Sequence, residues 1–200
     1  MGTIDSLASY CLPPLIQQLR QKYPDLSIRL QPDREAAIIE KVREGEIDIG
    51  VILDRKGEDS LLNITTIREE PLVLIASPYH PLSGLEKVEL DQLKEMEWIM
   101  PEESCNYRTM LEKVLRANGI PFRIGLELGN PEAIKRCVMT GPGISLLPKM
   151  VVEEEICRGD LAALPFAHPD IRLDLQMMIH PKKWISHSLL EFMNMLKRSS

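Results

Sequence analysis

The first fifty residues alternate between strand-like and helix-like patterns, and this alternation constrains the fold more than any other feature. Apolar residues recur at helical spacing over residues 7–23 and again over 38–42. Residues 26–31 alternate in polarity, and residues 47–53 form a short apolar run typical of a buried strand. A first strand is expected at the very start of the chain. Strands that alternate with helices in this way predict a parallel sheet with helical crossovers.

The rest of the chain continues the alternation and divides it into two lobes. Turn-forming residues are dense over 77–81, which indicates a crossing into a second lobe, and residues 161–165 lead back. We therefore expect a first lobe from residues 1–76 and 167–200 and a second from 77–166. The further strands are expected at 61–67, 71–77, 98–100, 124–128, 143–147 and 173–179, and the helices at 90–96, 107–118, 131–140, 151–158 and 186–197.

Composition excludes several classes of protein. The length of 200 residues suits two small lobes. The net charge of −6 argues against a free-standing DNA-binding domain, which usually carries a basic patch. No apolar run of about 18 residues predicts a membrane helix, and no secretory leader is visible. The four cysteines, Cys11, Cys105, Cys137 and Cys157, lack metal-site spacing and suit a reducing cytosol.

Catalytic and metal-binding motifs are missing from the sequence. There is no nucleophile elbow, no zinc-protease motif and no dinucleotide fingerprint. His187 and Glu191 have a spacing that could share a metal, but a solvated helix face is favoured. We therefore expect no enzyme activity, no metal and no cofactor.

Six short motifs occur in one order along the whole chain, and together they resemble the effector-binding domain of LysR-type transcriptional regulators. Each motif is weak alone, whereas six in register are specific. They are Leu12-Pro13-Pro14-Leu15, Tyr23-Pro24, Glu44-Gly45-Glu46-Ile47-Asp48, Glu70-Pro71-Leu72, His80-Pro81-Leu82 and Gly143-Ile144-Ser145-Leu146-Leu147-Pro148.

The resemblance implies an α/β fold of two Rossmann-like subdomains joined by two crossover strands, as in type II periplasmic-binding proteins. A small, anionic metabolite would bind in the cleft between the lobes. The helix-turn-helix module would lie outside this chain, so that DNA contact occurs only through that module. The family also implies a cytoplasmic homodimer, with contacts from helices 12–23 and 107–118, and a tetramer of the full-length protein.

In the first lobe, ligand contacts are expected where helices begin beyond the strands, because helix N-termini favour anions. Ser6 matches the family's effector-binding hydroxyl, beside Asp5, and would also cap its helix. Gly50 would end the central strand, and its backbone would form the cleft floor. Arg34 and Glu35 replace the family's glycine and small hydroxyl residue. Three readings stay open: Arg34 binds an anion, Glu35 binds an ammonium group, or both are solvated.

In the second lobe, the resemblance assigns contacts to the loop before the helix at 107–118 and to the start of the next helix. Arg108 could hold a carboxylate with two hydrogen bonds, or pair with a nearby glutamate (Glu102, Glu103 or Glu112). Asn130 could cap its helix, contact the ligand, or do both. The expected second-lobe contacts are Pro101, Glu103, Ser104, Cys105, Arg108, Asn130 and Pro131.

Two alternatives remain for the function. Cys105 aligns with the peroxide-reactive cysteine of redox-sensing family members, and a helix start activates a thiol. Its partner cysteine would fall near Val114, where the sequence has none. A free-standing solute-binding protein would share the two-lobe fold but would normally carry a leader. Pro13 and Pro14 leave one local choice open as well: a helix that begins near Leu12, or one that kinks there.

Overall fold

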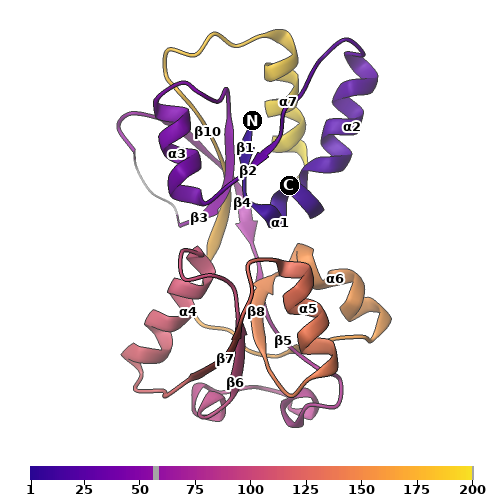
Figure 1. Cartoon of the computed structure of the whole chain (residues 1–200), viewed down its shortest axis with the longest axis vertical. Helices are drawn as coiled ribbons and strands as arrows, with labels where there is room; N and C mark the ends of the chain where they lie inside the picture. The colour runs from indigo at the N-terminus through magenta and orange to yellow at the C-terminus, as the bar shows by residue number, and fades with distance from the viewer. Residues whose placement is uncertain (56–58, 200) are drawn as a thin grey trace. The chain divides into compact units, whose positions relative to one another are not determined.

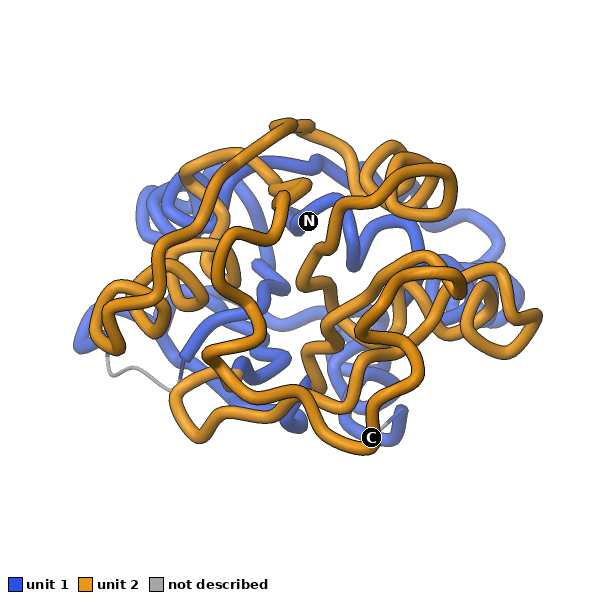
Figure 2. Tube along the Cα trace, turned by 90° about the horizontal axis from the view of Figure 1, so that it is seen from below, with its two compact units in different colours: residues 1–70, 173–200 blue, residues 71–172 orange. Residues whose placement is uncertain are grey.

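The computed structural model describes residues 1–55 and 59–199 and divides them into two compact units. Unit 1 comprises Met1–Glu70 and Leu173–Ser200, and unit 2 comprises Pro71–Arg172, as coloured in Figure 2. The chain therefore passes between the units twice, after Glu70 and after Arg172. None of the described helices is long and apolar enough to cross a membrane.

Unit 1 contains a five-stranded sheet in the order β2-β1-β3-β10-β4. The strands β1, β2 and β3 are parallel, with Gly2 opposite both Gln31 and Gly50, and β10 is antiparallel to both β3 and β4. The bounds are β1 (Gly2–Thr3), β2 (Gln31–Pro32), β3 (Gly50–Asp54), β4 (Asn63–Glu70) and β10 (Leu173–Ile179).

The helices of unit 1 are α1 (Asp5–Tyr10), α2 (Leu12–Lys22), α3 (Glu35–Arg43) and α7 (His187–Arg198). Figure 1 shows α3 on one side of the sheet and the neighbouring α2 and α7 on the other. The helical spacing of Leu12, Leu15 and Leu19 buries one face of α2, and α7 buries Phe192 and Leu196. These faces and the strands form the core of unit 1.

The structure decides the choice left open by the two prolines. α1 ends at Tyr10, Cys11 lies between the two helices as the C-cap of α1 and the N-cap of α2, and α2 begins at Leu12 with Pro13 and Pro14 in its first turn. Proline fits there because the first N–H groups of a helix have no intrahelical partner to lose. The six-residue α1 is therefore a separate element directly after β1.

In unit 2, β5 (Leu72–Ala76) lies between β8 (Ser145–Pro148) and β9 (Ala162–Leu164), and both of these strands are antiparallel to β5. A parallel pair, β6 (Glu97–Met100) and β7 (Arg123–Glu127), joins this sheet through a bridge between Trp98 and Ile144. The helices are α4 (Asn106–Ala117), α5 (Pro131–Thr140) and α6 (Lys149–Arg158), with short 3-10 turns at Pro81–Gly84 and Leu90–Leu93. Their core includes Trp98, Met100, Leu111, Leu115 and Ile144.

Most predicted helices and strands are confirmed, with three local differences. Of the expected strand at 26–31, only Gln31 lies in a paired strand, β2, and the helix expected at 90–96 is a 3-10 turn. The strand Ala162–Leu164 pairs with β5, so this segment stays in unit 2 rather than leading back.

The boundaries between the units differ from those expected at 76/77 and 166/167. The whole of β5 is hydrogen-bonded to β8 and β9, and therefore belongs to unit 2. At the return, Phe166 and Ile171 pack on the core of unit 2, and the Arg172 N–H lies 3.2 Å from Met110 Sδ. An apolar strand sequence does not reveal which sheet the strand joins, so these positions could not be read from the sequence.

Candidate functional site

Unit 1 gathers several polar side chains where its parallel strands end. The end of β1 leads into α1, the end of β2 leads into α3, and β3 ends at Asp54. Because these strands are parallel, their carboxyl ends lie at one edge of the sheet. We call this the unit 1 edge, and its polar residues are Asp5, Ser6, Arg34, Glu35 and Asp54.

Ser6 is the most informative residue of the unit 1 edge. It is only 3% exposed, and its hydroxyl makes no hydrogen bond with any described residue. The prediction that Ser6 caps the helix is wrong, because α1 begins at Asp5 and its N-cap is Ile4. The Ser6 hydroxyl is therefore available to a ligand, and its oxygen is not among the fully buried side-chain atoms that lack a partner. The adjacent Asp5 is exposed.

Glu35 is buried at the first turn of α3, with 8% exposure. Burial raises its pKa to about 7; its own backbone N–H opposes the shift and the nearby Asp54 adds to it. Burial also raises the pKa of Asp54, against a hydrogen bond from the Arg55 N–H. Glu35 is therefore partly protonated near neutral pH. The reading of both Arg34 and Glu35 as solvated charges is wrong for Glu35, although Arg34 is exposed.

The structure places Gly50 away from the unit 1 edge. The central strand begins at Gly50 rather than ending there, so the predicted cleft-floor position is wrong. A Cβ atom on Gly50 would lie 2.9 Å from both Ile38 Cγ2 and Met178 Cγ. This glycine therefore permits close packing of α3 on the sheet.

Unit 2 brings its predicted site residues together where β6 and β7 end. The Leu128 N–H donates to Met100 O at 3.0 Å, and a Cβ on Gly129 would lie 2.7 Å from Glu102 Oε1. The loop after β6 therefore lies beside the loop after β7, forming what we call the unit 2 edge. It includes Pro101, Glu103, Ser104, Cys105, Arg108, Asn130 and Pro131.

Within the unit 2 edge, the side chains differ in how accessible they are. Glu103, Ser104 and Asn130 are exposed, whereas Pro101 is buried. Cys105 is half-buried at the N-cap of α4 and makes no side-chain capping bond. The exposed members are therefore the ones free to approach a ligand directly.

Arg108 is buried and already paired within unit 2. Its Nε donates to Glu112 at 2.7 Å, and its Nη1 donates to Glu127 and to Pro101 O, both at 2.6 Å. Glu103 lies at 3.8 Å from Nη2. Arg108 was expected either to hold a ligand carboxylate or to pair with a nearby glutamate, and the structure shows it paired with glutamates. The guanidinium thereby ties the loop after β6 to the end of β7.

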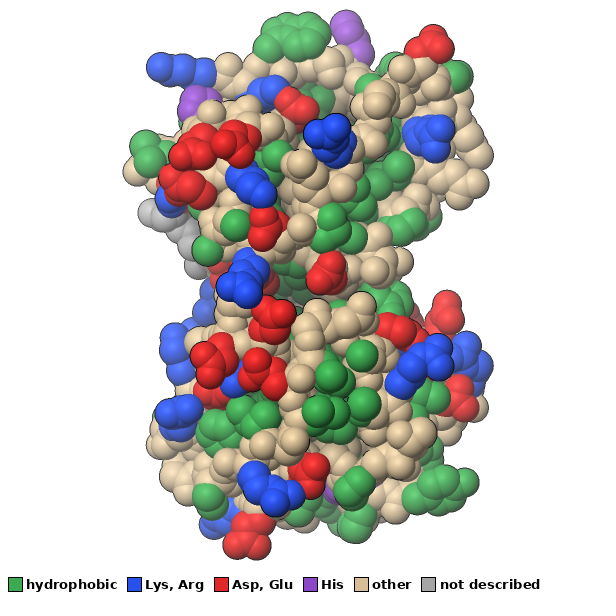
Figure 3. All heavy atoms as spheres, viewed as in Figure 1, with side chains coloured by type: hydrophobic (Ala, Val, Ile, Leu, Met, Phe, Trp, Pro, Cys, Tyr) green, Lys and Arg blue, Asp and Glu red, His purple; other side chains and the backbone are tan. Residues whose placement is uncertain are grey.

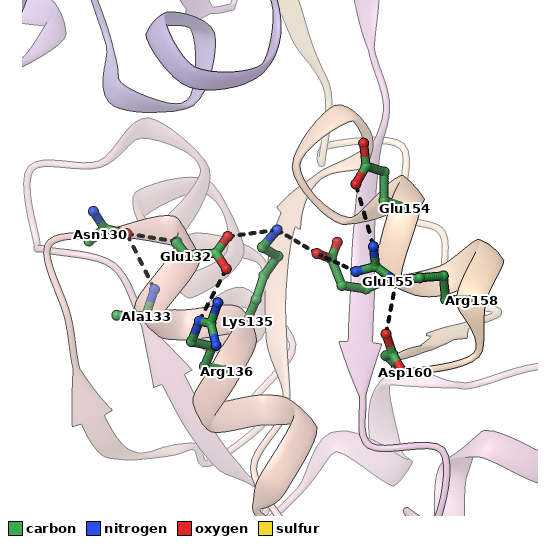
Figure 4. Close-up of polar contacts among 9 residues, drawn as sticks. All are labelled: Asn130, Glu132, Ala133, Lys135, Arg136, Glu154, Glu155, Arg158 and Asp160. Carbon is green, nitrogen blue, oxygen red and sulfur yellow. Dashed lines mark hydrogen bonds and ion pairs between the residues drawn. The ribbon is translucent and has the colours of Figure 1, made fainter.

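Asn130 caps α5, and a buried lysine follows one turn later (Figure 4). Asn130 Oδ1 accepts from the N–H of Glu132 at 2.8 Å and of Ala133 at 3.3 Å. Lys135 Nζ lies 2.9 Å from both Glu132 Oε2 and Glu155 Oε1. Asn130 therefore holds the start of α5 in place, and Lys135 joins α5 to α6.

Sequence reasoning missed four charged residues around these edges. Asp54 could have been found as the polar residue that ends a buried strand. Glu127, Lys135 and Glu155 gave no such signal, because charged residues in a strand or amphipathic helix usually face solvent. Their importance arises only from tertiary contacts.

The charged side chains form no metal-ligand cluster among the described residues and no continuous basic surface on the face drawn in Figure 3. No group of three His, Cys, Asp or Glu side chains among these residues could hold a metal ion. Over the face drawn in Figure 3, acidic and basic side chains are interspersed in each unit. A duplex would instead require a continuous basic surface.

Comparison with known proteins identifies the family. The model of the LysR substrate binding domain matches residues 1–200. The chain belongs to this family. The regulatory domain of CcmR from Synechocystis PCC6803, solved in complex with 2-PG, aligns with a TM-score of 0.87 and 26% identity over 99% of this chain and 94% of that one. The fold of this LysR domain is accordingly of the type II periplasmic-binding-protein class.

Its curated relatives are transcriptional regulators. YwqM of Bacillus subtilis (strain 168) and YfiE of Escherichia coli (strain K12), both described as uncharacterized HTH-type transcriptional regulators, are each 31% identical to it. The matches cover 100% and 98% of this chain, and 68% and 66% of those proteins. The LysR domain therefore spans about two thirds of the length of these regulators.

Proposed function

We propose that this LysR domain senses a small anionic metabolite, which binds at the unit 1 edge and thereby controls transcription. The observation that carries the proposal is the Ser6 hydroxyl at the unit 1 edge, which makes no hydrogen bond within the described residues although Ser6 is only 3% exposed. The 2-PG complex of CcmR supports a small-molecule ligand in this fold.

Glu35 determines how the charge of the ligand affects binding. Below pH 7 its carboxyl group is mostly neutral, so it does not repel an anion and can donate a hydrogen bond. Above pH 7 the carboxylate repels an anion and attracts an ammonium group. Anion affinity should therefore fall as pH rises through about 7, and amine affinity should rise.

The test is a binding screen with organic acids, sulfate, amino acids and amines at pH 6 and pH 8. Hits from thermal shift are measured by calorimetry, because a ligand stabilises only the state that it binds. We expect carboxylates that bind more tightly at pH 6 than at pH 8. Ser6→Ala should lower the affinity for these carboxylates about tenfold, which is the ratio expected for the loss of one hydrogen bond.

Ser9→Ala is the matched control, because Ser9 is an exposed serine on the same helix. Equal effects of the two substitutions would contradict the assignment of Ser6. Amines that bind more tightly at pH 8 would contradict an anionic ligand and give Glu35 the anchoring role. No binding at either pH, together with peroxide-dependent loss of the Cys105 thiol, would favour the redox alternative.

Control of transcription in response to the ligand would require the whole regulator, of which this domain is a part. We propose that DNA is bound only by a helix-turn-helix module outside this chain, as the names of the relatives suggest. The domain itself then acts by ligand-induced population shift rather than by catalysis. A transcriptional role also places it in the cytoplasm. A DNA-binding assay on this chain alone should show no specific binding.

We further propose an antiparallel homodimer, and a tetramer of the full-length regulator. The outer face of α2 bears a groove of about 680 Å³ that includes Ile16, Ile28 and Leu30. The neighbouring β2 is an edge strand of unit 1, as β7 is of unit 2 beside α4. The α4 and β7 of a second copy could therefore cover α2 and β2, so that the open sides of the edge strands β2 and β7 are both buried.

Sedimentation analysis tests the dimer. Ile16→Glu places a charge in the groove and should convert dimer to monomer, because a desolvated lone charge is costly. Gln18→Glu adds the same charge to the exposed part of α2 outside the groove and should leave the dimer intact. A monomer for the unchanged chain at all concentrations would overturn the proposal.

A further inference from the structure

A second pocket lies within unit 1, at the opposite end of the sheet from the unit 1 edge. It is bounded by α2, by residues 26–29, by Asp48 and Ile49 just before β3, and by the start of α7. Its volume is about 370 Å³, which is within the range of small-molecule sites. Because β3 runs from this pocket to the unit 1 edge, no residue can serve both sites at once.

The pocket combines an apolar floor with an excess of positive charge. Leu19, Ile49 and Phe192 supply the floor. At the rim, Lys183 forms an ion pair with Asp48. Arg29 is exposed, and its guanidinium makes no hydrogen bond or ion pair within the described part of the chain. The side-chain charges at the rim therefore sum to one uncompensated positive charge, beside the Met1 amino group, which also lines the pocket and donates to Arg29 O at 3.1 Å.

The first turn of α7 adds hydrogen-bond donors to the same pocket. Ser186 caps this twelve-residue helix by accepting from the Leu189 N–H at 3.2 Å, and both Ser186 and Ser188 line the pocket. The N–H groups at the start of a helix have no intrahelical partner and carry partial positive charge. Arg29 and the start of α7 thus both favour an anion.

Trp184 gives the pocket an exposed aromatic wall. Its side chain is 79% exposed although it lies beside the apolar floor. An exposed large apolar group next to a pocket is typical of a binding site, and an indole can stack on a flat ligand. The other tryptophan, Trp98, is fully buried in unit 2.

We propose that this pocket is a second ligand site, which takes a small organic monoanion with an aromatic or compact apolar body. The anionic group lies against Arg29 and the start of α7, and the apolar body lies between Trp184 and the floor. The site is independent of the proposed effector site, because it uses different residues at the other end of the sheet.

Quenching of tryptophan fluorescence by acrylamide tests this proposal on the intact chain. Only Trp184 is accessible to the quencher, since Trp98 has no exposed surface. Phenylacetate should protect Trp184 from quenching in a saturable manner. Phenylacetamide, which has the same shape without the charge, should bind at least about tenfold more weakly, as should phenylacetate to Arg29→Gln.

Two matched variants separate this site from other causes. Lys182→Gln removes a neighbouring exposed charge that does not line the pocket, and should leave protection unchanged. Ser6→Ala should also leave it unchanged, and loss of protection there would assign the probe to the effector site instead. The proposal is overturned by equal protection from acid and amide, by no effect of Arg29→Gln, or by the absence of protection. Protection that depends on protein concentration without probe would show that a second copy covers the pocket.

Discussion

Units 1 and 2 share part of a topology but differ in how the buried charged side chains near their edges are paired. In each, a βαβαβ segment forms three neighbouring strands, ordered β2-β1-β3 and β7-β6-β8, with the last contact made through the Trp98–Ile144 bridge. At the unit 1 edge, the Ser6 hydroxyl is unpartnered and Glu35 is in no ion pair of the described residues. In unit 2, buried Arg108 and Lys135 each contact two glutamates closely.

This difference indicates different roles for the two units. Paired charges in a low-dielectric environment fix the elements that carry them, so the unit 2 edge is set before a ligand arrives. Unpaired groups at the unit 1 edge make the folded state less stable than it could be, and a ligand that pairs with them relieves that cost. We therefore expect unit 1 to respond more to ligand and pH, and unit 2 to depend more on its internal ion pairs.

The largest expected effect comes from breaking a buried pair of unit 2. Lys135→Met leaves the buried Glu155 carboxylate with only the exposed Arg158 as a partner, at 3.2 Å from Oε1, and with an Oε2 that already lacks one. Loss of one member of a buried pair costs about 3 kcal/mol of unfolding free energy. Urea denaturation of both proteins measures this loss directly.

Two further variants sharpen that result. Arg136→Met removes a neighbouring charge that is largely exposed, and should change stability by less than about 0.5 kcal/mol. Replacing both partners, Lys135→Met with Glu155→Leu, should recover much of the loss because no uncompensated charge remains. A double variant less stable than Lys135→Met would show that the ion pair itself is not the reason.

The next effect concerns unit 1 and pH. The pKa of Glu35 is raised from 4.5 to about 7 in the folded state, so the folded protein binds a proton more tightly than the unfolded chain. This contribution is fully present below pH 4.5 and is lost as pH rises to about 7. By the relation between pKa and free energy, the loss is on the order of 3 kcal/mol.

Glu35→Gln isolates this contribution, because the amide stays neutral at every pH. Relative to the unchanged protein, the variant should gain stability between pH 5 and pH 8, as measured by urea denaturation at both values. Glu44→Gln, an exposed glutamate at the end of the same helix, is the control and should show no such gain. A pH dependence identical in both variants would mean that Glu35 is not the titrating group.

Sequence reasoning predicted the elements well because helical and strand periodicity are local. The stripe Leu12, Leu15 and Leu19 and the proline at the start of α5 are visible without any tertiary information. The positions of Ser6 and Asn130 at helix starts were predictable for the same reason. Strand pairing was not, so β5 was assigned to the wrong sheet and Gly50 to the wrong end of β3.

Charged residues show where local reasoning stops. Glu35 begins a helix, and an exposed position would be the ordinary expectation for a glutamate. Its burial depends on contacts with elements that are distant in sequence, and so does the pairing of Arg108 with Glu127. These contacts set pKa values and accessibility, which is why the family assignment could be predicted but the chemistry of the edges could not.

A smaller effect is expected at the glycine that follows one helix in each unit. Gly45 follows α3 with φ +76°, Gly159 ends α6 with φ +79°, and a Cβ at either would meet open space. Alanine should therefore cost only the strain of the left-handed conformation, about 1 kcal/mol at each position. Urea denaturation of Gly45→Ala and Gly159→Ala measures both. A much larger loss in one unit would show a packing role that the open space at both positions argues against.

The smallest expected effect concerns two buried serines. Ser145 in β8 has no exposed surface and its buried hydroxyl lacks a partner, whereas the Ser6 hydroxyl makes no hydrogen bond within the described residues but is not among the fully buried unsatisfied atoms. Removing the unsatisfied hydroxyl in Ser145→Ala should raise the unfolding free energy by no more than about 1 kcal/mol, and Ser6→Ala should change it less. Ligand then separates the two, because a metabolite that binds Ser6 should stabilise Ser145→Ala fully and Ser6→Ala less. Equal stabilisation of both variants by ligand would remove the asymmetry between the units, since neither hydroxyl would then contribute to binding.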